Sequence, residues 1–407
     1  MRNGSAGGAR PASQQSMRQH NLALVMGTVA GHGPVSRAAV AGHTGLTRPA
    51  VSSLVDALLA AGLLTELGPA ANGRVGRPGS ALMVSDRGPA GLGLEVGVGH
   101  LGVCVTDLRG QVRAWTVVDS PNAALPPAEV LARLAALADE ATETAAGLGL
   151  RPVAAVMAVP GLVAESSGTV ESAPNLGWHH VPVADLWAGP LPPRVENEAN
   201  LGALAELWAH PVAADFIHVS AESGIGAALV VGGRLFTGAR GLAGELGHMP
   251  VHPDGPSCSC GARGCLEQYA AKAAVLRAAG LPPSRPGDTG SPRVREGDGI
   301  GLLAARAREG DVRVVRALEK AGEALGTALA GAVNLLDPAA VVLGGAYAEL
   351  GEWLVPPTRR ELAARVTVRA WDPAALTVSE LGRRGPLLGA ALATVRSVLE
   401  DPAALGA

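Results

Sequence analysis

One short segment of the chain gathers side chains that are suited to bind a metal ion. His248 is followed by Cys258, Cys260 and Cys265, which are three of the four cysteines among the 407 residues. Thiolates and imidazole are the usual ligands of four-coordinate zinc, and a set of four leaves no position for a catalytic water. We therefore expect a structural zinc site, because the alternative of three reduced thiols in a loop leaves this clustering unexplained. The remaining cysteine, Cys104, stands between two valines of an expected strand and is predicted to be buried.

Composition indicates a globular protein of two or three domains. The apolar fraction is 48% and the charged fraction 17%, which excludes global disorder. No apolar run is long enough to span a membrane, and the N-terminus has no apolar signal segment. We therefore expect a cytoplasmic protein without membrane contact, in which clustered cysteines bind metal rather than form disulfides.

Basic residues concentrate at one end of the chain. Residues 1–90 carry eight arginines against three acidic residues, whereas the remainder carries 25 basic and 33 acidic residues. This asymmetry indicates that only the N-terminal part meets a polyanion. We expect a disordered lead over residues 1–16, a DNA-binding domain over residues 17–90, called the head below, and a larger domain over residues 91–407, called the body.

The head carries the pattern of a helix-turn-helix unit. Apolar residues at helical spacing predict a first helix around residues 22–29, and Ser36 can cap a short second helix over residues 37–43. Thr47 can cap a third helix, which has an apolar face and ends before Gly62. In such a unit the N-terminal residues of the last helix reach base edges in the major groove. Here those residues are Arg48, Ser52 and Ser53.

A basic loop follows the third helix. Residues 63–67 and 81–84 read as two short strands, and the loop between them carries Arg74 and Arg77 among glycines. Such a loop fits a wing that contacts the minor groove or the phosphates. Helices and loop together predict a winged helix-turn-helix domain. The alternative is a small helical domain with a basic hairpin and no role in DNA binding.

The body shows the same order of elements twice, which predicts two lobes with a cleft between them. The first lobe spans about residues 91–209 plus a C-terminal helix, and the second spans about residues 210–380. The expected strands are 91–98, 101–108, 113–118, 151–159, 216–221, 227–231 and 340–343, and the expected helices are 127–147, 198–209 and 300–336. The Pro- and Gly-rich interval 280–299 is predicted to be a surface loop.

Two segments of the body resemble the most specific signature of a known family. GLAGELGH (241–248) and CSCGARGCLE (258–267) are similar to the signature of the ROK family, which comprises repressors, open reading frames and sugar kinases. The head resembles that of the family's repressors. The resemblance implies an actin-like, ribonuclease-H-like fold with two lobes, and a sugar bound in the cleft beside the zinc loop.

The resemblance also implies which residues contact the sugar. They are Asn175, Asn197, Glu198, Glu245, His248 and Glu267. Carboxylates and amides that converge on one cleft can satisfy adjacent sugar hydroxyls, each of which is both donor and acceptor. Taken one at a time, these residues have simpler explanations, because Asn197 and Glu198 could start a helix and Asn175 could make a turn.

A kinase of this family needs parts that the chain has partly lost. The resemblance implies an Asp-x-Gly-Gly-Thr turn for phosphate and metal, but the corresponding turn begins at Glu95, keeps Gly97, and has valine and glycine in the last two places. The catalytic base is Asp in the family and Glu198 here. A carboxylate displaced by about 1 Å can cost roughly 10²-fold in rate. Glycine turns for nucleotide persist in part, or are ordinary strand ends, at Gly224, Gly226, Gly344 and Gly345.

We therefore predict a sugar-responsive, DNA-binding regulator, a repressor of carbohydrate-metabolism genes with a degenerate kinase body. Its partners would be a double-stranded DNA operator and a small sugar or sugar phosphate, and a two-fold operator favours a homodimer or homotetramer. One alternative is an active hexose kinase that uses ATP and Mg²⁺ and carries a regulatory head. Another is a repressor without a small effector, controlled by a protein that docks near the zinc loop.

Overall fold

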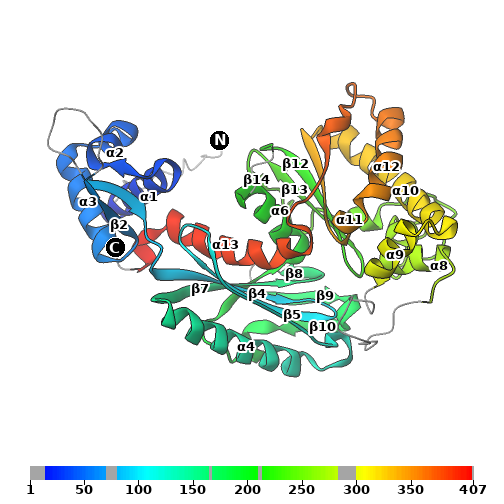
Figure 1. The fold of residues 1–407 in the computed structure, drawn as a ribbon, viewed down its shortest axis with the longest axis horizontal. Helices are drawn as coiled ribbons and strands as arrows, with labels where there is room; N and C mark the ends of the chain where they lie inside the picture. Colours follow the sequence, from blue (N-terminus) through cyan, green and yellow to red (C-terminus); the bar gives the residue numbers. More distant parts are fainter. Residues whose placement is uncertain (1–13, 70–79, 165–166, 210–212, 283–298, 406–407) are drawn as a thin grey trace, which may run out of the picture.

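The structure, a computed structural model, describes residues 14–69, 80–164, 167–209, 213–282 and 299–405. The head lies at one end of the molecule, and the body consists of two lobes that are each built on a five-stranded sheet (Figure 1). The body is α/β, as its sequence pattern predicts. Within the described ranges, no helix has the length and apolar character needed to cross a bilayer.

The predicted helices of the head are present with their predicted caps. They are α1 (Gln14–His32), α2 (Arg37–Thr44) and α3 (Arg48–Ala60), beside a small sheet of β1 (Val35–Ser36), β3 (Ser80–Val84) and β2 (Leu64–Pro69). Ser36 Oγ accepts a hydrogen bond from Ala39 N at 3.2 Å, and Thr47 Oγ1 accepts one from Ala50 N at 3.4 Å. Gly45 ends α2 in the left-handed conformation, with a φ of 71°.

The ends of the head differ from the expected bounds. α1 begins at Gln14, so residues 14–16 belong to a helix and not to a disordered lead. No glycine or proline interrupts the sequence between Gln14 and Leu22, which lets the helix extend. At the other end, β4 (Gly88–Val96) starts before residue 91 and joins the sheet of the body. Residues 1–13 and 70–79, the latter with Arg74 and Arg77, lie outside the described residues.

The first lobe is built on the sheet β11-β7-β4-β5-β6. Its other strands are β5 (His100–Asp107), β6 (Val112–Asp119), β7 (Leu150–Val159) and β11 (Pro193–Asn197). β4, β5 and β6 form the predicted antiparallel meander, while β7 runs parallel to β4 and β11 parallel to β7. α4 (Pro127–Gly147) covers one face, and α6 (Glu198–Ala209) and α13 (Gly385–Glu400) lie on the other (Figure 1).

A small antiparallel sheet is appended to this lobe, and the sequence pattern does not predict it. Its strands are β8 (Leu162–Ala164), β9 (Thr169–Ala173) and β10 (Trp178–Pro182). The strands have three to five residues each, too few for their alternation to stand out. Trp178 is buried in the core of the lobe and anchors this sheet.

The second lobe repeats the strand order of the first. Its sheet, β14-β13-β12-β15-β16, is built from β12 (Phe216–Ala221), β13 (Ile225–Val231), β14 (Arg234–Leu235), β15 (Ala340–Gly345) and β16 (Leu376–Val378). Its helices are α7 (Glu267–Ala270), α8 (Lys272–Ala278), α9 (Gly299–Arg308), α10 (Val312–Leu336), α11 (Ala346–Glu349) and α12 (Gly351–Arg365). The predicted loop 280–299 lies outside the described residues between 283 and 298.

The prediction of one helix over residues 300–336 is wrong. The chain forms α9 and α10 with a break between them. Gly310 adopts a left-handed φ of 81°, and Asp311 caps α10 by accepting a hydrogen bond from Arg313 N at 3.0 Å. A glycine followed by a capping aspartate ends one helix and begins the next, which outweighs the continuous apolar spacing.

The head and the C-terminal helix share one hydrophobic core. Val395 and Val398 of α13 lie in the same buried cluster as Leu22 and Met26 of α1. The short helix η6 (Pro402–Leu405) adds Leu405 to this cluster. The N-terminal and C-terminal helices of the described chain, α1 and η6, therefore pack together in the head.

Candidate metal centre and adjoining pocket

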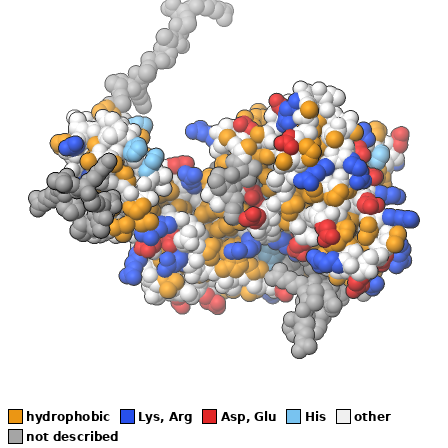
Figure 2. Space-filling model, turned by 45° about the horizontal axis from the view of Figure 1, so that its top comes forward, with side chains coloured by type: hydrophobic (Ala, Val, Ile, Leu, Met, Phe, Trp, Pro, Cys, Tyr) orange, Lys and Arg blue, Asp and Glu red, His pale blue; other side chains and the backbone are white. Residues whose placement is uncertain are grey.

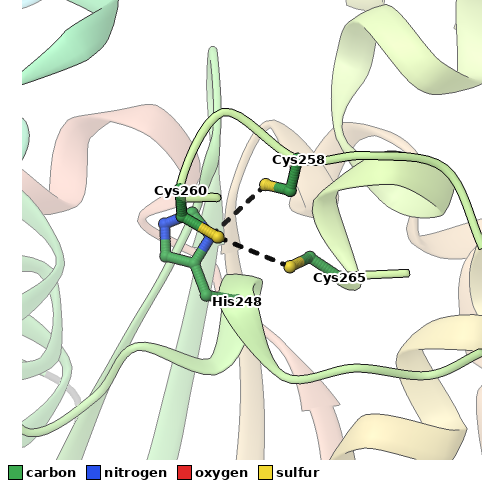
Figure 3. Close-up of side chains that lie close together, drawn as sticks. All are labelled: His248, Cys258, Cys260 and Cys265. Atoms are coloured by element: carbon green, nitrogen blue, oxygen red, sulfur yellow. Dashed lines mark hydrogen bonds between the residues drawn. The ribbon is translucent and has the colours of Figure 1, made fainter. Parts of the chain in front are cut away.

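The four predicted metal ligands lie together. His248 ends the short helix η3 (Leu246–His248), and the cysteines lie on the following loop with their sulfurs near the imidazole (Figure 3). Cys258 Sγ is 3.8 Å from His248 Nδ1, and the Sγ atoms of Cys260 and Cys265 are 3.7 Å apart. All four ligand atoms lie within 4.8 Å of one another. Two thiolates that bind one tetrahedral zinc at about 2.3 Å are separated by about 3.7 Å, so the set has the dimensions of a zinc site.

The backbone of the cysteine loop holds these ligands in place. Cys258 N donates a hydrogen bond to Ala262 O, and Gly264 N donates one to Pro256 O, each at 2.8 Å. Gly264 has a φ of 69°, and a Cβ at this position would lie 1.6 Å from the carbonyl oxygen of His252. The two sides of the loop can approach this closely only because residue 264 has no side chain.

The thiols differ in how readily they lose a proton. Burial raises the pKa of Cys258, but hydrogen bonds from Cys260 and His248 outweigh burial and lower that pKa to about 6. Burial and the neighbouring sulfurs raise the pKa of Cys265 to about 12. The thiolate of Cys258 therefore forms readily, and its negative charge opposes the deprotonation of Cys265. A divalent cation would remove this repulsion.

A pocket that is partly open to solvent lies beside the cluster. His248 Nε2 faces Glu245 Oε2 at 3.8 Å, and Glu245 lines the pocket. Glu245 therefore faces both the metal cluster and the pocket. The full lining comprises residues 161–163, Glu196, Asn197, Asn200, Gly226, Ala227 and 241–245.

Asn175 and Glu267, two further predicted contacts, meet at the turn between β12 and β13. Glu267 Oε1 accepts a hydrogen bond from Ile225 N at 2.8 Å. A Cβ at Gly224 would lie 2.4 Å from this oxygen and 3.3 Å from Nδ2 of Asn175. Gly224 therefore leaves room for both side chains. The pair stands outside the lining of the pocket, and Glu267 ties the end of the cysteine loop to the sheet.

Asn197 lines the pocket and also performs the simpler role that its position allows. Its Oδ1 accepts hydrogen bonds from Ala199 N at 2.8 Å and Asn200 N at 3.2 Å, which caps α6. Its Nδ2 donates to Gly161 O at 2.8 Å and fixes the opposite wall. One N–H of the amide remains for a ligand.

Two residues of the pocket wall were missed at the sequence level. Asn200 Nδ2 donates to Glu196 Oε1 at 2.9 Å, and both side chains line the pocket. The signal was their spacing of four residues around Asn197 and Glu198, which places them beside the predicted pair. The residues that β11 and the first turn of α6 present to the pocket are thus mostly polar.

The side chain of His100 fills the turn between β4 and β5. His100 Nε2 lies 3.2 Å from Oε1 of the buried Glu95. A Cβ at Gly97 would lie 2.2 Å from His100 Cε1, so the imidazole rests directly against the glycine backbone. Backbone that could approach a phosphate is therefore covered by a histidine, a role that the sequence alone did not assign to His100.

Several carboxylates face this histidine. Burial, together with Glu95 and Glu222, raises the pKa of Glu198 to about 8. Burial lowers the pKa of His100, but Glu95 outweighs burial, and Glu222 and Glu198 add to its effect, so that the pKa rises to about 9. At neutral pH most Glu198 carboxyls hold a proton and cannot accept another, whereas the imidazole is charged. The charge of the imidazole is therefore balanced within the site by its ion pair with Glu95.

This ion pair makes stability depend on pH. The folded-state pKa of His100 lies above its ordinary value of 6.5, so its stabilising contribution is complete below about pH 6.5 and is lost as the pH rises through 9. Glu198, raised from 4.5 to about 8, acts in the same direction between these values. We expect the unfolding free energy to fall between pH 6 and pH 9.5, by about 3 kcal/mol through His100. Urea unfolding at both pH values measures this loss.

The His100→Gln variant supplies the comparison for this pH dependence. It should show a smaller decrease between the two pH values, while His180→Gln, which removes an exposed histidine paired with Glu171, should keep the wild-type decrease. An unchanged pH dependence in H100Q would contradict the assignment.

The predicted DNA contacts that the structure describes share one side of α3. Arg48 and Ser53 are exposed and Ser52 is half-buried, while the apolar residues of the helix face the core. Arg37 is held elsewhere, because its guanidinium pairs with Asp56 at 2.7 Å and with Glu66 at 2.8 Å. Of these two arginines, Arg48 at the start of α3 is therefore the better candidate for a DNA contact.

Comparison with known proteins adds a decisive observation, since a sequence model of the ROK family matches residues 91–396. The chain belongs to the ROK family. Among ROK proteins, the xylose repressor of Bacillus subtilis (strain 168) is 28% identical over 384 residues, which cover 93% of this chain and 95% of that protein. The similarity to this ROK repressor therefore includes the head.

Solved ROK structures show the same architecture. A ROK family transcriptional regulator, described as a homolog of the E. coli MLC protein, superposes with a TM-score of 0.74 at 26% identity and covers 95% of this chain and 97% of its own. A ROK glucokinase from Streptomyces griseus, in complex with glucose and AMPPNP, gives a TM-score of 0.62 at 28% identity and covers 75% of this chain and 98% of its own. The expected actin-like fold of the ROK body is confirmed.

The glycines at expected ROK nucleotide positions have packing roles in this chain. A Cβ at Gly344 would lie 2.3 Å from the ring of buried His218, and Gly345 adopts a φ of 56° where β15 ends. Gly226 lines the pocket, and Gly224 leaves room for Glu267. The alternative that these glycines are strand-end residues accounts for them without a nucleotide.

Proposed function

We propose that the protein is a transcriptional repressor whose body binds a small sugar and whose head binds an operator. One observation carries the proposal: similarity to a xylose repressor covers 93% of the chain, head included, whereas the glucokinase structure covers 75%. The glucokinase is matched over 98% of its own length, so the uncovered part of this chain is additional to a kinase.

The pocket has the chemistry of a sugar site. Asn197 and Glu245 line it together with Glu196 and Asn200, and these groups both accept and donate hydrogen bonds. His248, Cys258, Cys260 and Cys265 would hold zinc, which would fix the loop that carries Glu245. The array of hydroxyls of a xylose-class pentose or a hexose matches such a wall.

The site favours binding over phosphoryl transfer. His100 covers Gly97 where a nucleotide phosphate would approach, and Glu95 stands where the resemblance implies Asp. Glu198 is protonated in most molecules at neutral pH, which weakens its claim to be a catalytic base. ATP and Mg²⁺ therefore have no assigned role.

Operator binding is assigned to the head. Arg48, Ser52 and Ser53 would read bases in the major groove, and Arg74 and Arg77 would contact the minor groove or phosphates. The visible face of the body carries acidic and basic side chains intermixed, which offers DNA no uniform surface (Figure 2). A homodimer would match an operator with two-fold symmetry.

The test measures operator affinity with and without sugar. An operator is selected from random duplexes with the full chain, and its affinity is measured with D-xylose or D-glucose added. We expect at least one sugar of a wider panel to weaken operator binding by about 10-fold or more, within the usual range of allosteric coupling. Operator binding that no sugar changes would overturn the proposal, and steady phosphorylation of a sugar with ATP would support the kinase alternative.

Two arginine variants locate the interface in the same assay. Arg48→Ala should lose about 1–3 kcal/mol of specific binding, the usual value of a base contact, and Arg133→Ala should lose none. Arg133 is an exposed residue of α4 paired with Glu129, and it controls for the loss of a positive charge.

A further inference from the structure

α13 contacts the helix that begins at the pocket, the sheet of the first lobe and the core of the head. We propose that α13 carries the state of the pocket to the head, and that its close crossing with α6 is the contact through which it does so. The inference rests on the proposed function, since it concerns how sugar binding changes operator binding. In Figure 1 this helix, coloured red, runs from the lobes to the head.

α6 connects the pocket to α13. This helix starts immediately after Asn197, and Asn200 in its first turn also lines the pocket. The next residue, Leu201, meets α13 through its backbone, because a Cβ at Gly389 would lie 1.9 Å from Leu201 O. The glycine brings the helices together without a flexible side chain between them. A displacement of the first turn of α6 is therefore passed to α13 directly.

The sheet side of α13 is packed equally closely. A Cβ at Gly93 of β4 would lie 2.6 Å from Ala391 N, and a Cβ at Gly91 would lie 1.9 Å from Thr394 Oγ1. α13 is thus confined between β4 and α6. In such close packing, a change at one side of α13 is transmitted to its other contacts.

The N-terminal end of α13 is connected to the second lobe. Arg383, two residues before the helix, places its Nε 2.8 Å from Glu349 and 3.4 Å from Glu222. Both carboxylates belong to the second lobe, and Glu222 follows β12 beside the turn that carries Gly224. A change in the angle between the lobes therefore acts on the start of α13 as well as on its side.

The other end of α13 is part of the head. Val395 and Val398 are buried against Leu22 and Met26 of α1, and η6 extends the contact. A helix of 16 residues spans about 24 Å, so it can join the pocket region to the head as one rigid element. A ligand that favours one position of α6 would thereby favour one orientation of the head.

A competing route exists through the covalent connection. β3 ends at Val84 and β4 begins at Gly88, and Arg109 reaches across this connection to Val84 O at 2.7 Å and Asp86 at 3.2 Å. If the signal followed this segment, changes at the crossing of α6 and α13 would leave the sugar response intact. The two routes can therefore be told apart by substitution at Gly389.

The test is Gly389→Ala in the full chain, with Gly147→Ala as the matched control. The added methyl must separate α13 from Leu201, whereas a Cβ at Gly147 meets nothing within 4 Å. Three quantities are measured: sugar affinity by calorimetry, operator affinity without sugar, and operator affinity with saturating sugar. The sugar used is the one that weakens operator binding by the wild-type protein. We expect G389A to keep each separate affinity within about 3-fold while the sugar effect on operator binding falls from about 10-fold or more to below about 2-fold.

Each outcome decides the inference. A sugar effect in G389A equal to that of wild type and G147A would overturn it and leave the proposed function standing. A wild type whose operator affinity no sugar changes would remove the proposed function itself and this inference with it. If G389A fails to fold, Leu201→Ala is used instead, because Leu201 is buried with Ala390 and Ala393 of α13 in the same crossing. An undiminished sugar effect in L201A then overturns the inference.

Discussion

Cys265→Ser is expected to abolish metal binding and to weaken sugar binding by about 10- to 100-fold, because the metal no longer fixes the loop beside the pocket. Cys265 is fully buried beside Cys260, and the next residues lead into Glu267. With one ligand replaced, the metal no longer holds the loop, and a zinc set of this type can contribute on the order of 10 kcal/mol of apparent local folding free energy. Glu245, His248 and Glu267 should then lose their fixed positions together.

The measurements are metal content by atomic emission and sugar affinity by calorimetry. Wild type should carry one zinc per chain and C265S none. Cys104→Ala is the control, because it removes a buried thiol that lies in β5 away from the cluster. Full zinc content in C265S would show that the ligand set is wrongly assigned, and unchanged sugar affinity without zinc would separate the metal from the pocket.

Glu245→Gln is expected to reduce sugar affinity by about 10- to 150-fold, which corresponds to about 1.5–3 kcal/mol for a hydrogen bond to a charged group. Glu245 lines the pocket, and its carboxylate can accept a hydrogen bond from a sugar hydroxyl. The amide keeps the shape of the side chain but loses the charge. Metal content should remain at the wild-type level, because Glu245 is not itself a ligand of the cluster.

The control for this variant is Glu171→Gln, an exposed carboxylate of β9 that pairs with His180. It should bind sugar as wild type does. An E245Q protein with wild-type affinity would place the sugar elsewhere, and the turn where Asn175 meets Glu267 would become the next candidate.

Local signals in the sequence were sufficient for much of the head and for the metal cluster. Ser36 and Thr47 cap their helices as predicted, since a capping side chain acts within three residues of its own position. The cysteine cluster is equally local, because its last three ligands fall within eight positions. The glycine and the capping aspartate at 310 and 311 were also local signals, and the continuous apolar spacing concealed them.

Contacts between distant segments were beyond the reach of the sequence pattern. The apolar periodicity of α13 does not indicate that its last turns complete the core of the head. An apolar helix face shows that it is buried, but not which other segment of the chain it packs against. His100 is a second example. Its ring covers Gly97 only because the turn between β4 and β5 directs the side chain back over the glycine. A histidine that follows a glycine in the sequence does not by itself indicate this contact.

The packing of Val395, Val398 and Leu405 against the core of the head has a consequence for synthesis on the ribosome. The head is translated first but cannot complete its core until the last residues of the chain have emerged. A nascent or prematurely terminated chain would therefore lack part of the core of the head. Under the proposed function, operator binding would therefore begin only after the body has also been synthesised.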